Sequence, residues 1–179
     1  MATYISNRPS ETEALGEVWG RVARSGLVIN LSGELGAGIT QLVKGLARGL
    51  DITERVHSPT FAIINVYSGG RLRLFHLDLY RLETAAQMDS AGIEEYLNPD
   101  GVTVIEWAER LGLLLRSPML NPRRRQPDDS GTGNAKPEAH PAGRAQGRHN
   151  FNRGRLLRFV NIEPLNESTR QITYEDIGD

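Results

Sequence analysis

The chain has 179 residues, a net charge of −1 and no cysteine. This length is enough for one domain with a buried core, and the lack of cysteine excludes disulfides and thiolate metal sites. The balanced charge gives no global indication of a nucleic-acid or membrane surface. No apolar run approaches the roughly 20 residues that span a bilayer, and the N-terminus lacks the pattern of a signal peptide. We therefore expect a cytoplasmic, single-domain protein without membrane contact.

The first predicted elements are a helix, a strand and a second helix. Ser10 and Glu13 have the spacing of a capping box, and the apolar periodicity that follows predicts a helix from about 10 to 24. The apolar run over residues 27–31 is typical of a buried parallel strand. A second striped segment predicts a helix that ends near Gly49.

The stretch GELGAGIT lies between this strand and the second helix. In the phosphate-loop pattern G-x-x-x-x-G-K-[ST], Gly33, Gly38 and Thr40 fall in place, but Ile39 stands where the pattern has lysine. Glycines let backbone N–H groups turn inward, and the helix N-terminus adds positive charge, so the stretch favours a polyphosphate site. Taken alone, the octapeptide also fits a plain strand-to-helix turn.

Neither lysine of the chain is expected to replace the charge that is missing at position 39. The chain has only Lys44 and Lys136; Lys44 lies one turn into the helix and is expected to point away, and Lys136 lies in a tract without apolar periodicity. Arg55 or Arg81 could supply the charge instead, although the sequence does not place them.

The remaining pattern alternates strands and helices. TFAIINVY and RLRLFHLDLYR flank the turn SGG and predict a hairpin. A helix interrupted at Gly92 is expected over 84–97, followed by the buried strand VTVIEW and a short helix. LLRFVNIEP and RQITYED predict two closing strands. An α/β sandwich is the fold class that accommodates this order.

Residues 117–150 are rich in proline, glycine and arginine, with six basic and three acidic residues. We predict a disordered insertion between a core at 1–116 and strands at 151–179 that complete the same domain. A solvated linker is the simpler interpretation of this tract.

Two carboxylates are expected at strand ends. Glu106 ends the strand VTVIE, and Asp78 ends the second hairpin strand. Ligands of open α/β sheets gather at this edge, where an acid can hold Mg²⁺ or orient water. The alternative for each is a surface acid. Thr60 in HSPTF could sense a phosphate or simply belong to a turn. His57 and His76 are too far apart to predict a metal site.

Together, GELGAGIT, HSPTFAIINVY, FHLDLYRL, GIEEYLNPDGVTVIEWAERLG and RQITYED occur in this order. They resemble the bacterial TsaE family, also called YjeE, the ATPase component of tRNA threonylcarbamoyladenosine biosynthesis. The resemblance covers Ser10 to about Leu115 and the final strands. It implies a P-loop NTPase-like sandwich with a small mixed central sheet flanked by helices, and ATP with Mg²⁺ as cofactors. It also implies a TsaB–TsaD complex as partner, which ATP hydrolysis resets between rounds of modification at tRNA position 37. With such a partner, the alternative to a solvated linker at 117–150 is that Arg123, Arg124 and Arg125 contact tRNA phosphates in the assembled complex.

The resemblance also implies roles for individual residues. Thr40 and Glu106 would hold Mg²⁺, and Glu106, Asp78 and Thr60 would serve turnover. The residues assigned to the nucleotide are Gly33, Gly36, Ala37, Gly38, Ile39, Thr40, Gln41 and Arg170.

The sequence departs from the family at two of these positions. Family members carry lysine at position 39 and usually a hydroxyl residue at position 41, where this chain has Ile39 and Gln41. Two function classes therefore remain open. One is a working or weakened ATPase subunit of the modification machinery. The other is a catalytically inactive protein of the same fold that binds the complex or nucleotide without turnover.

Overall fold

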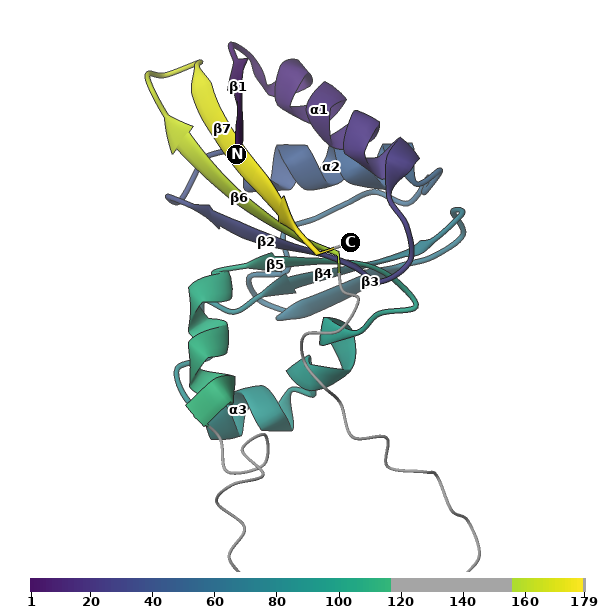
Figure 1. Ribbon diagram of the computed structural model, residues 1–179, viewed down its shortest axis with the longest axis vertical. Coiled ribbons are helices and arrows are strands. Elements are labelled where there is room, and N and C mark those ends of the chain that lie inside the picture. Colours follow the sequence, from purple (N-terminus) through teal and green to yellow (C-terminus); the bar gives the residue numbers. More distant parts are fainter. Residues whose placement is uncertain (117–155, 179) are drawn as a thin grey trace, which may run out of the picture.

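A seven-stranded sheet runs through the computed structural model, which describes residues 1–116 and 156–178 (Figure 1). The predicted insertion at 117–150 lies outside these residues. The elements, in chain order, are β1 (Ala2–Ser6), α1 (Pro9–Val22), β2 (Leu27–Gly33), α2 (Ile39–Gly49), β3 (Ile64–Tyr67), β4 (Arg73–Asp78), α3 (Ala85–Ser90), the 3₁₀ segment η1 (Ile93–Leu97), β5 (Gly101–Glu106), the 3₁₀ segment η2 (Ala108–Arg116), β6 (Leu157–Pro164) and β7 (Arg170–Ile177).

The strand order is β1-β7-β6-β2-β5-β4-β3. The four inner strands β6, β2, β5 and β4 run parallel, and β3, β7 and β1 each pair antiparallel with their neighbour. Every residue of β5 is buried, as expected for a parallel strand that is covered on both faces. The mixed sheet confirms the predicted α/β fold.

Helices cover both faces of the sheet. In Figure 1, α1 and α2 lie on one face, and α3 lies with the short helical segments on the other. Each face has its own apolar core. Leu31 and Leu46 belong to the core under α1 and α2, whereas Leu77, Met88 and Ile105 belong to the core on the α3 side. Within the described ranges, no helix has both the length and the apolarity needed to cross a membrane.

The contact between α1 and α2 is made largely by glycine. A methyl group added at Gly45 would overlap the carbonyl oxygen of Glu13, and one added at Gly16 would overlap that of Leu42. The two helix backbones therefore approach more closely than any side chain allows. This close contact fixes α2, and with it the loop that precedes α2, against the sheet.

Most predicted elements are confirmed, including the hairpin of β3 and β4, the break at Gly92 between α3 and η1, and the closing strands β6 and β7. The predicted capping box at Ser10 is wrong. Pro9 occupies the first turn of α1, which begins after Arg8, and Glu11 accepts a hydrogen bond from the Asn7 N–H at 2.8 Å. Proline suits this position because its φ is already helical.

The buried face of α1 also differs from the apolar pattern. Trp19 is buried, but Val18 and Val22 are exposed, and the glycines at 16 and 20 occupy the contact with α2. The periodicity identified the helix correctly. It did not identify the buried face, because glycine gives no hydrophobic signal.

Candidate functional site

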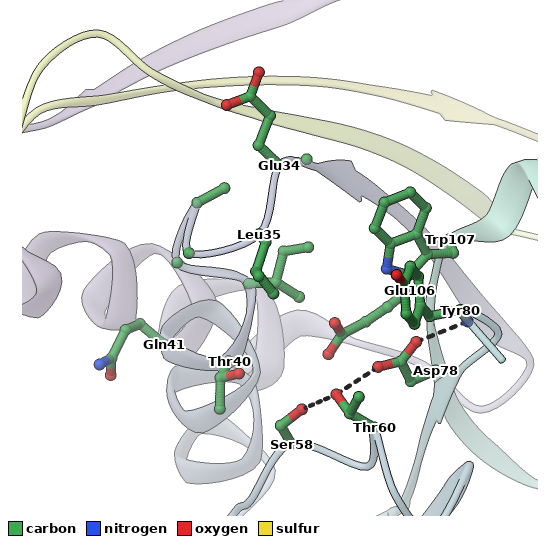
Figure 2. A pocket seen from close by; sticks show the side chains of 15 residues that line it. Glu34, Leu35, Thr40, Gln41, Ser58, Thr60, Asp78, Tyr80, Glu106 and Trp107 are labelled. Carbon is green, nitrogen blue, oxygen red and sulfur yellow. Dashed lines mark hydrogen bonds between the residues drawn. The ribbon is translucent and has the colours of Figure 1, made fainter.

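A pocket of about 540 Å³ opens at the edge of the sheet where β2, β4 and β5 end. The strands are in register there, since Asp78 pairs with Glu106 and Leu31 pairs with Glu106 from the other side. The lining residues come from the glycine-rich loop, from the loop before β3 and from the ends of β4 and β5 (Figure 2). They are Gly33, Glu34, Leu35, Gly36, Ala37, Gly38, Ile39, Thr40, Gln41, Ser58, Thr60, Asp78, Tyr80, Glu106 and Trp107.

The glycine-rich loop has the backbone of a phosphate cradle. Gly36 and Gly38 adopt φ values of 82° and 105°, which side chains other than glycine rarely tolerate. Gly33 is required for a different reason, because a Cβ there would lie 2.8 Å from the carbonyl oxygen of Ile162 on β6. Gly38 caps α2 without any side-chain hydrogen bond, and its carbonyl oxygen accepts the N–H of Gln41 at 3.0 Å. This leaves the N–H groups of Ile39 and Thr40, at the start of the helix, for an anion.

Ile39 is the first residue of α2, and only 9% of it is exposed. Its side chain joins the core under α1 and α2 while also lining the pocket. It offers neither a donor nor a charge to a phosphate. Lys44 points away from the glycine-rich loop, as the sequence predicts. Its Nζ lies 3.4 Å from Gln41 Oε1, and the residue lines a separate groove beside α1. The side chain of Gln41 points away from the acids in Figure 2.

Three side chains form a hydrogen-bonded chain on the opposite wall. Thr60 Oγ1 donates to Asp78 Oδ2 at 2.7 Å, and Ser58 Oγ lies 2.8 Å from Thr60 Oγ1 (Figure 2). Because the Thr60 proton goes to Asp78, Ser58 must donate to Thr60. The second Asp78 oxygen accepts the N–H of Tyr80 at 2.9 Å. Asp78 therefore joins the loop before β3 to the end of β4.

Glu106 lies at the centre of the pocket. Its carboxylate points toward the side of the pocket where Thr40 lies in the first turn of α2 (Figure 2), and the residue is buried. Oε1 lies 2.6 Å from Nε2 of His76, which is fully buried on β4. Trp107 follows with a φ of 58°, an unfavourable value for a residue with a large side chain, and its ring packs 5.2 Å from that of Tyr80. The aromatic pair closes one side of the pocket.

The arginines that sequence reasoning considered lie outside the pocket lining. Arg170 Nε donates to the carbonyl oxygen of Ala37 at 3.0 Å, so it contacts the loop backbone. Arg81 lies over the ring of Phe61, 4.8 Å from its centre. Arg55 lines the groove that contains Lys44. None of these three cations lines the described part of the pocket.

The pocket lining is acidic. Its fifteen described residues include the carboxylates of Glu34, Asp78 and Glu106 and no lysine or arginine. Across 1–116 and 156–178, no three His, Cys, Asp or Glu residues group in a way that could hold a metal ion. A hydroxyl at Thr40 and a carboxylate at Glu106 are nevertheless hard oxygen ligands, and Mg²⁺ typically takes one or two of these together with phosphate oxygens. The residues present thus fit a magnesium ion that arrives with a polyphosphate, and they do not fit a phosphate held by a side-chain cation.

The sequence predicted most of the residues that meet in this pocket, but it gave no role to Ser58, Tyr80 or the neighbouring His76. Ser58 lies in the motif HSPTF with Thr60, and Tyr80 lies in the motif FHLDLYRL with Asp78. Their place beside these two residues is the feature of the sequence that could have identified them. His76 could have been found from alternation along β4, which places it on the same face as Asp78.

Comparisons with known proteins agree with this geometry. The model of the family described as threonylcarbamoyl adenosine biosynthesis protein TsaE matches residues 6–130. A Bacillus subtilis protein named tRNA threonylcarbamoyladenosine biosynthesis protein TsaE is 45% identical over 100 residues, which are 56% of this chain and 62% of that protein. A Nostoc protein of the same name is 48% identical over 112 residues, covering 60% of this chain and 68% of that protein. The alignment thus spans less than two thirds of the Bacillus relative.

The comparison with solved structures also finds a protein from Bacillus subtilis. The crystal structure of Bacillus subtilis YdiB superimposes with a TM-score of 0.62 and 26% identity, covering 99% of this chain and 86% of the other. The shared fold is P-loop-like and implies nucleotide binding in general. Because the family model matches well over half of the sequence, the chain belongs to the TsaE family.

Proposed function

We propose that the chain binds ATP together with Mg²⁺ in this pocket and acts in the biosynthesis of threonylcarbamoyladenosine in tRNA. The observation that carries the proposal is the meeting of the glycine-rich loop with Glu106 and Asp78 at one edge of the sheet. The names of the curated relatives support the pathway. A TsaB–TsaD complex is the partner that we propose, and tRNA is reached through that complex.

Each residue of the pocket has a role in this proposal. The N–H groups of Gly36, Gly38 and the first turn of α2 hold the phosphates. Thr40 and Glu106 hold Mg²⁺, which would neutralise phosphate charge and polarise the bond to be cleaved. Asp78 fixes Thr60 through the 2.7 Å hydrogen bond and so positions the loop that faces the terminal phosphate.

Arg170 supports the nucleotide indirectly in this scheme. Its bond to the Ala37 carbonyl favours the loop conformation in which the N–H groups face the pocket. Ile39 contributes its backbone N–H rather than its side chain, whereas the N–H of Gln41 already donates to the carbonyl oxygen of Gly38 at 3.0 Å.

The charge of the pocket favours slow hydrolysis. Asp78 and Glu106 face an incoming polyphosphate with no cation in the described lining to balance them. Nucleotide binding should therefore depend strongly on Mg²⁺, and turnover should be weak because no side chain of the described lining neutralises the charge that develops on the terminal phosphate. We keep as the second candidate a protein that binds nucleotide or the complex without turnover, which the apolar Ile39 favours.

Exposed apolar side chains support a protein partner. Leu35 at the tip of the loop is fully exposed, and Phe61 and Tyr80 are also exposed beside or within the pocket lining. Apolar groups gathered at one place on a surface are typical of contact sites.

The test is reconstitution. A TsaB–TsaD preparation with tRNA, ATP and an activated threonylcarbamoyl donor is assayed for modified adenosine over many rounds, with and without this chain. Stimulation together with ATP hydrolysis supports the active subunit. Binding to the complex without stimulation supports the second candidate, and the absence of both contradicts the proposal.

A further inference from the structure

His76 is a polar residue in an apolar position. It lies on β4 between Leu74 and Asp78, and side chains alternate along a strand, so all three face the side of the sheet covered by α1 and α2. On β5, Val104 pairs with His76 and belongs to the same apolar core. The side chain of His76 is fully buried. A leucine or valine would be the ordinary residue here.

The imidazole makes one hydrogen bond in the described part of the chain. Nε2 lies 2.6 Å from Glu106 Oε1, whereas Nδ1 is buried without a partner. A carboxylate only accepts hydrogen bonds when ionised, so we assign a proton to Nε2. An unpaired buried nitrogen destabilises a core. Core stability therefore does not explain why position 76 is a histidine. The hydrogen bond to Glu106 does.

This bond restricts one oxygen of Glu106. No donor within the described residues contacts Oε2, and the carboxylate is directed into the pocket (Figure 2). A carboxylate that holds a metal needs its free oxygen aimed before the metal arrives, and a partner in the surrounding shell commonly provides this. The strand register places His76 beside Glu106. Asp78 pairs with Glu106, and His76 lies two residues before Asp78 on the same face of β4.

We propose that His76 is a positioning residue that holds Oε1 of Glu106 and thereby presents Oε2 to Mg²⁺. This inference rests on the proposed function, since it assumes that Glu106 serves a magnesium–nucleotide complex. His76 itself touches neither the metal nor the nucleotide. It acts through the orientation of one carboxylate.

The experiment compares three variants with the parent protein. His76→Leu keeps an apolar side chain of useful size and removes the donor, whereas His76→Gln places an amide N–H at a similar reach. Leu74→Val is the matched control, because it disturbs the same face of β4 two residues away without touching Glu106. For each protein we measure thermal unfolding, ATP affinity in EDTA, and the Mg²⁺ concentration that gives half-maximal ATP binding.

The inference predicts a selective change in the magnesium requirement. His76→Leu should raise the half-maximal Mg²⁺ concentration about 10- to 100-fold, the usual effect of losing such a supporting partner. ATP affinity in EDTA should stay within about threefold. His76→Gln should restore most of the magnesium response, and Leu74→Val should show the parental response even if it melts earlier.

Three results would overturn the inference. An unchanged magnesium requirement in His76→Leu would mean that the bond does not position Glu106. An equal loss of ATP affinity with and without Mg²⁺, or the same magnesium defect in Leu74→Val, would mean a general structural role. If His76→Leu fails to fold, His76→Asn replaces it, since the shorter amide does not reach Glu106. A parent protein that binds no ATP at any Mg²⁺ concentration would instead contradict the proposed function, and this inference would fall with it.

Discussion

Thr60 Oγ1 lies 2.7 Å from Asp78 Oδ2, so the loop before β3 is tied to the last residue of β4. We expect Thr60→Val to break this tie and lower ATP turnover by at least about tenfold, because a bond to a charged acceptor contributes about 1.5–3 kcal/mol. ATP affinity should change by less than about threefold. Thr60→Ser keeps the hydroxyl and serves as the control. If Thr60→Val retains the turnover of the parent protein, Thr60 has no role in ATP hydrolysis.

Restoring the lysine tests the effect of Ile39. Ile39→Lys should tighten ATP binding about 10- to 100-fold, since one charge-assisted hydrogen bond contributes about 1.5–3 kcal/mol, and it should raise turnover. Ile39→Met is the control, because it keeps a buried apolar side chain without a charge. Binding and turnover are measured by calorimetry and phosphate release. Equal affinity in the lysine and methionine variants would show that the missing charge is not the defect.

The two parts of the site that the sequence predicted well are those encoded by short patterns. Gly33, Gly36 and Gly38 stand at fixed spacing, and the structure requires glycine at all three. Glu106 and Asp78 each end an apolar run, and parallel strands bring such ends to one edge. Local patterning was sufficient to identify these positions, although distant segments make the contacts around them, Ile162 at Gly33 and β5 beside β4.

Other features depend on contacts between distant segments. β1 has too little apolar character to be predicted, and it forms by pairing with β7 at the other end of the chain. His76 meets Glu106 across thirty positions, which becomes evident only when the β4–β5 register is known. Arg170 was expected near the nucleotide from resemblance, and its hydrogen bond to Ala37 could not be derived from sequence.

Gly45 should be among the most sensitive positions of the fold. Gly45→Ala forces a methyl group into the Glu13 carbonyl oxygen, so α1 must move away from α2. We expect the free energy of unfolding to fall by about 3 kcal/mol or more, at the upper end of the range for overpacking. Gly112→Ala is the matched control, since nothing lies within 4 Å of the added Cβ. Chemical denaturation of the two variants checks this, and equal stability would contradict the tight helix contact.

Arg158 and Asp176 link stability to pH. Hydrogen bonding and the charge of Arg158 lower the pKa of Asp176, while its partial burial opposes the shift. A lowered folded-state pKa means that the stabilisation is present above the unfolded pKa of about 3.9 and is lost as pH falls through the folded value.

The contribution should be small because the Asp176 side chain is 43% exposed. We expect Asp176→Asn to reduce the free energy of unfolding by less than about 1 kcal/mol at pH 7, and the difference from the parent should disappear near pH 2. Urea denaturation at both pH values measures it. A difference that persists undiminished in acid would mean that the substitution disturbs packing instead of removing an ion pair.

We expect the pocket to bind magnesium–ATP even with Ile39 in the loop, and the fluorescence of Trp107 reports on this binding. Trp107 lines the pocket, whereas Trp19, the other tryptophan, is buried between α1 and the sheet with Arg158 over its ring. We predict a saturable fluorescence change when ATP is added with Mg²⁺, a much weaker one in EDTA, the same response in Trp19→Phe and none in Trp107→Phe. If the fluorescence of the parent protein does not change at any ATP concentration, and calorimetry detects no heat of binding, magnesium–ATP binding in this pocket is contradicted.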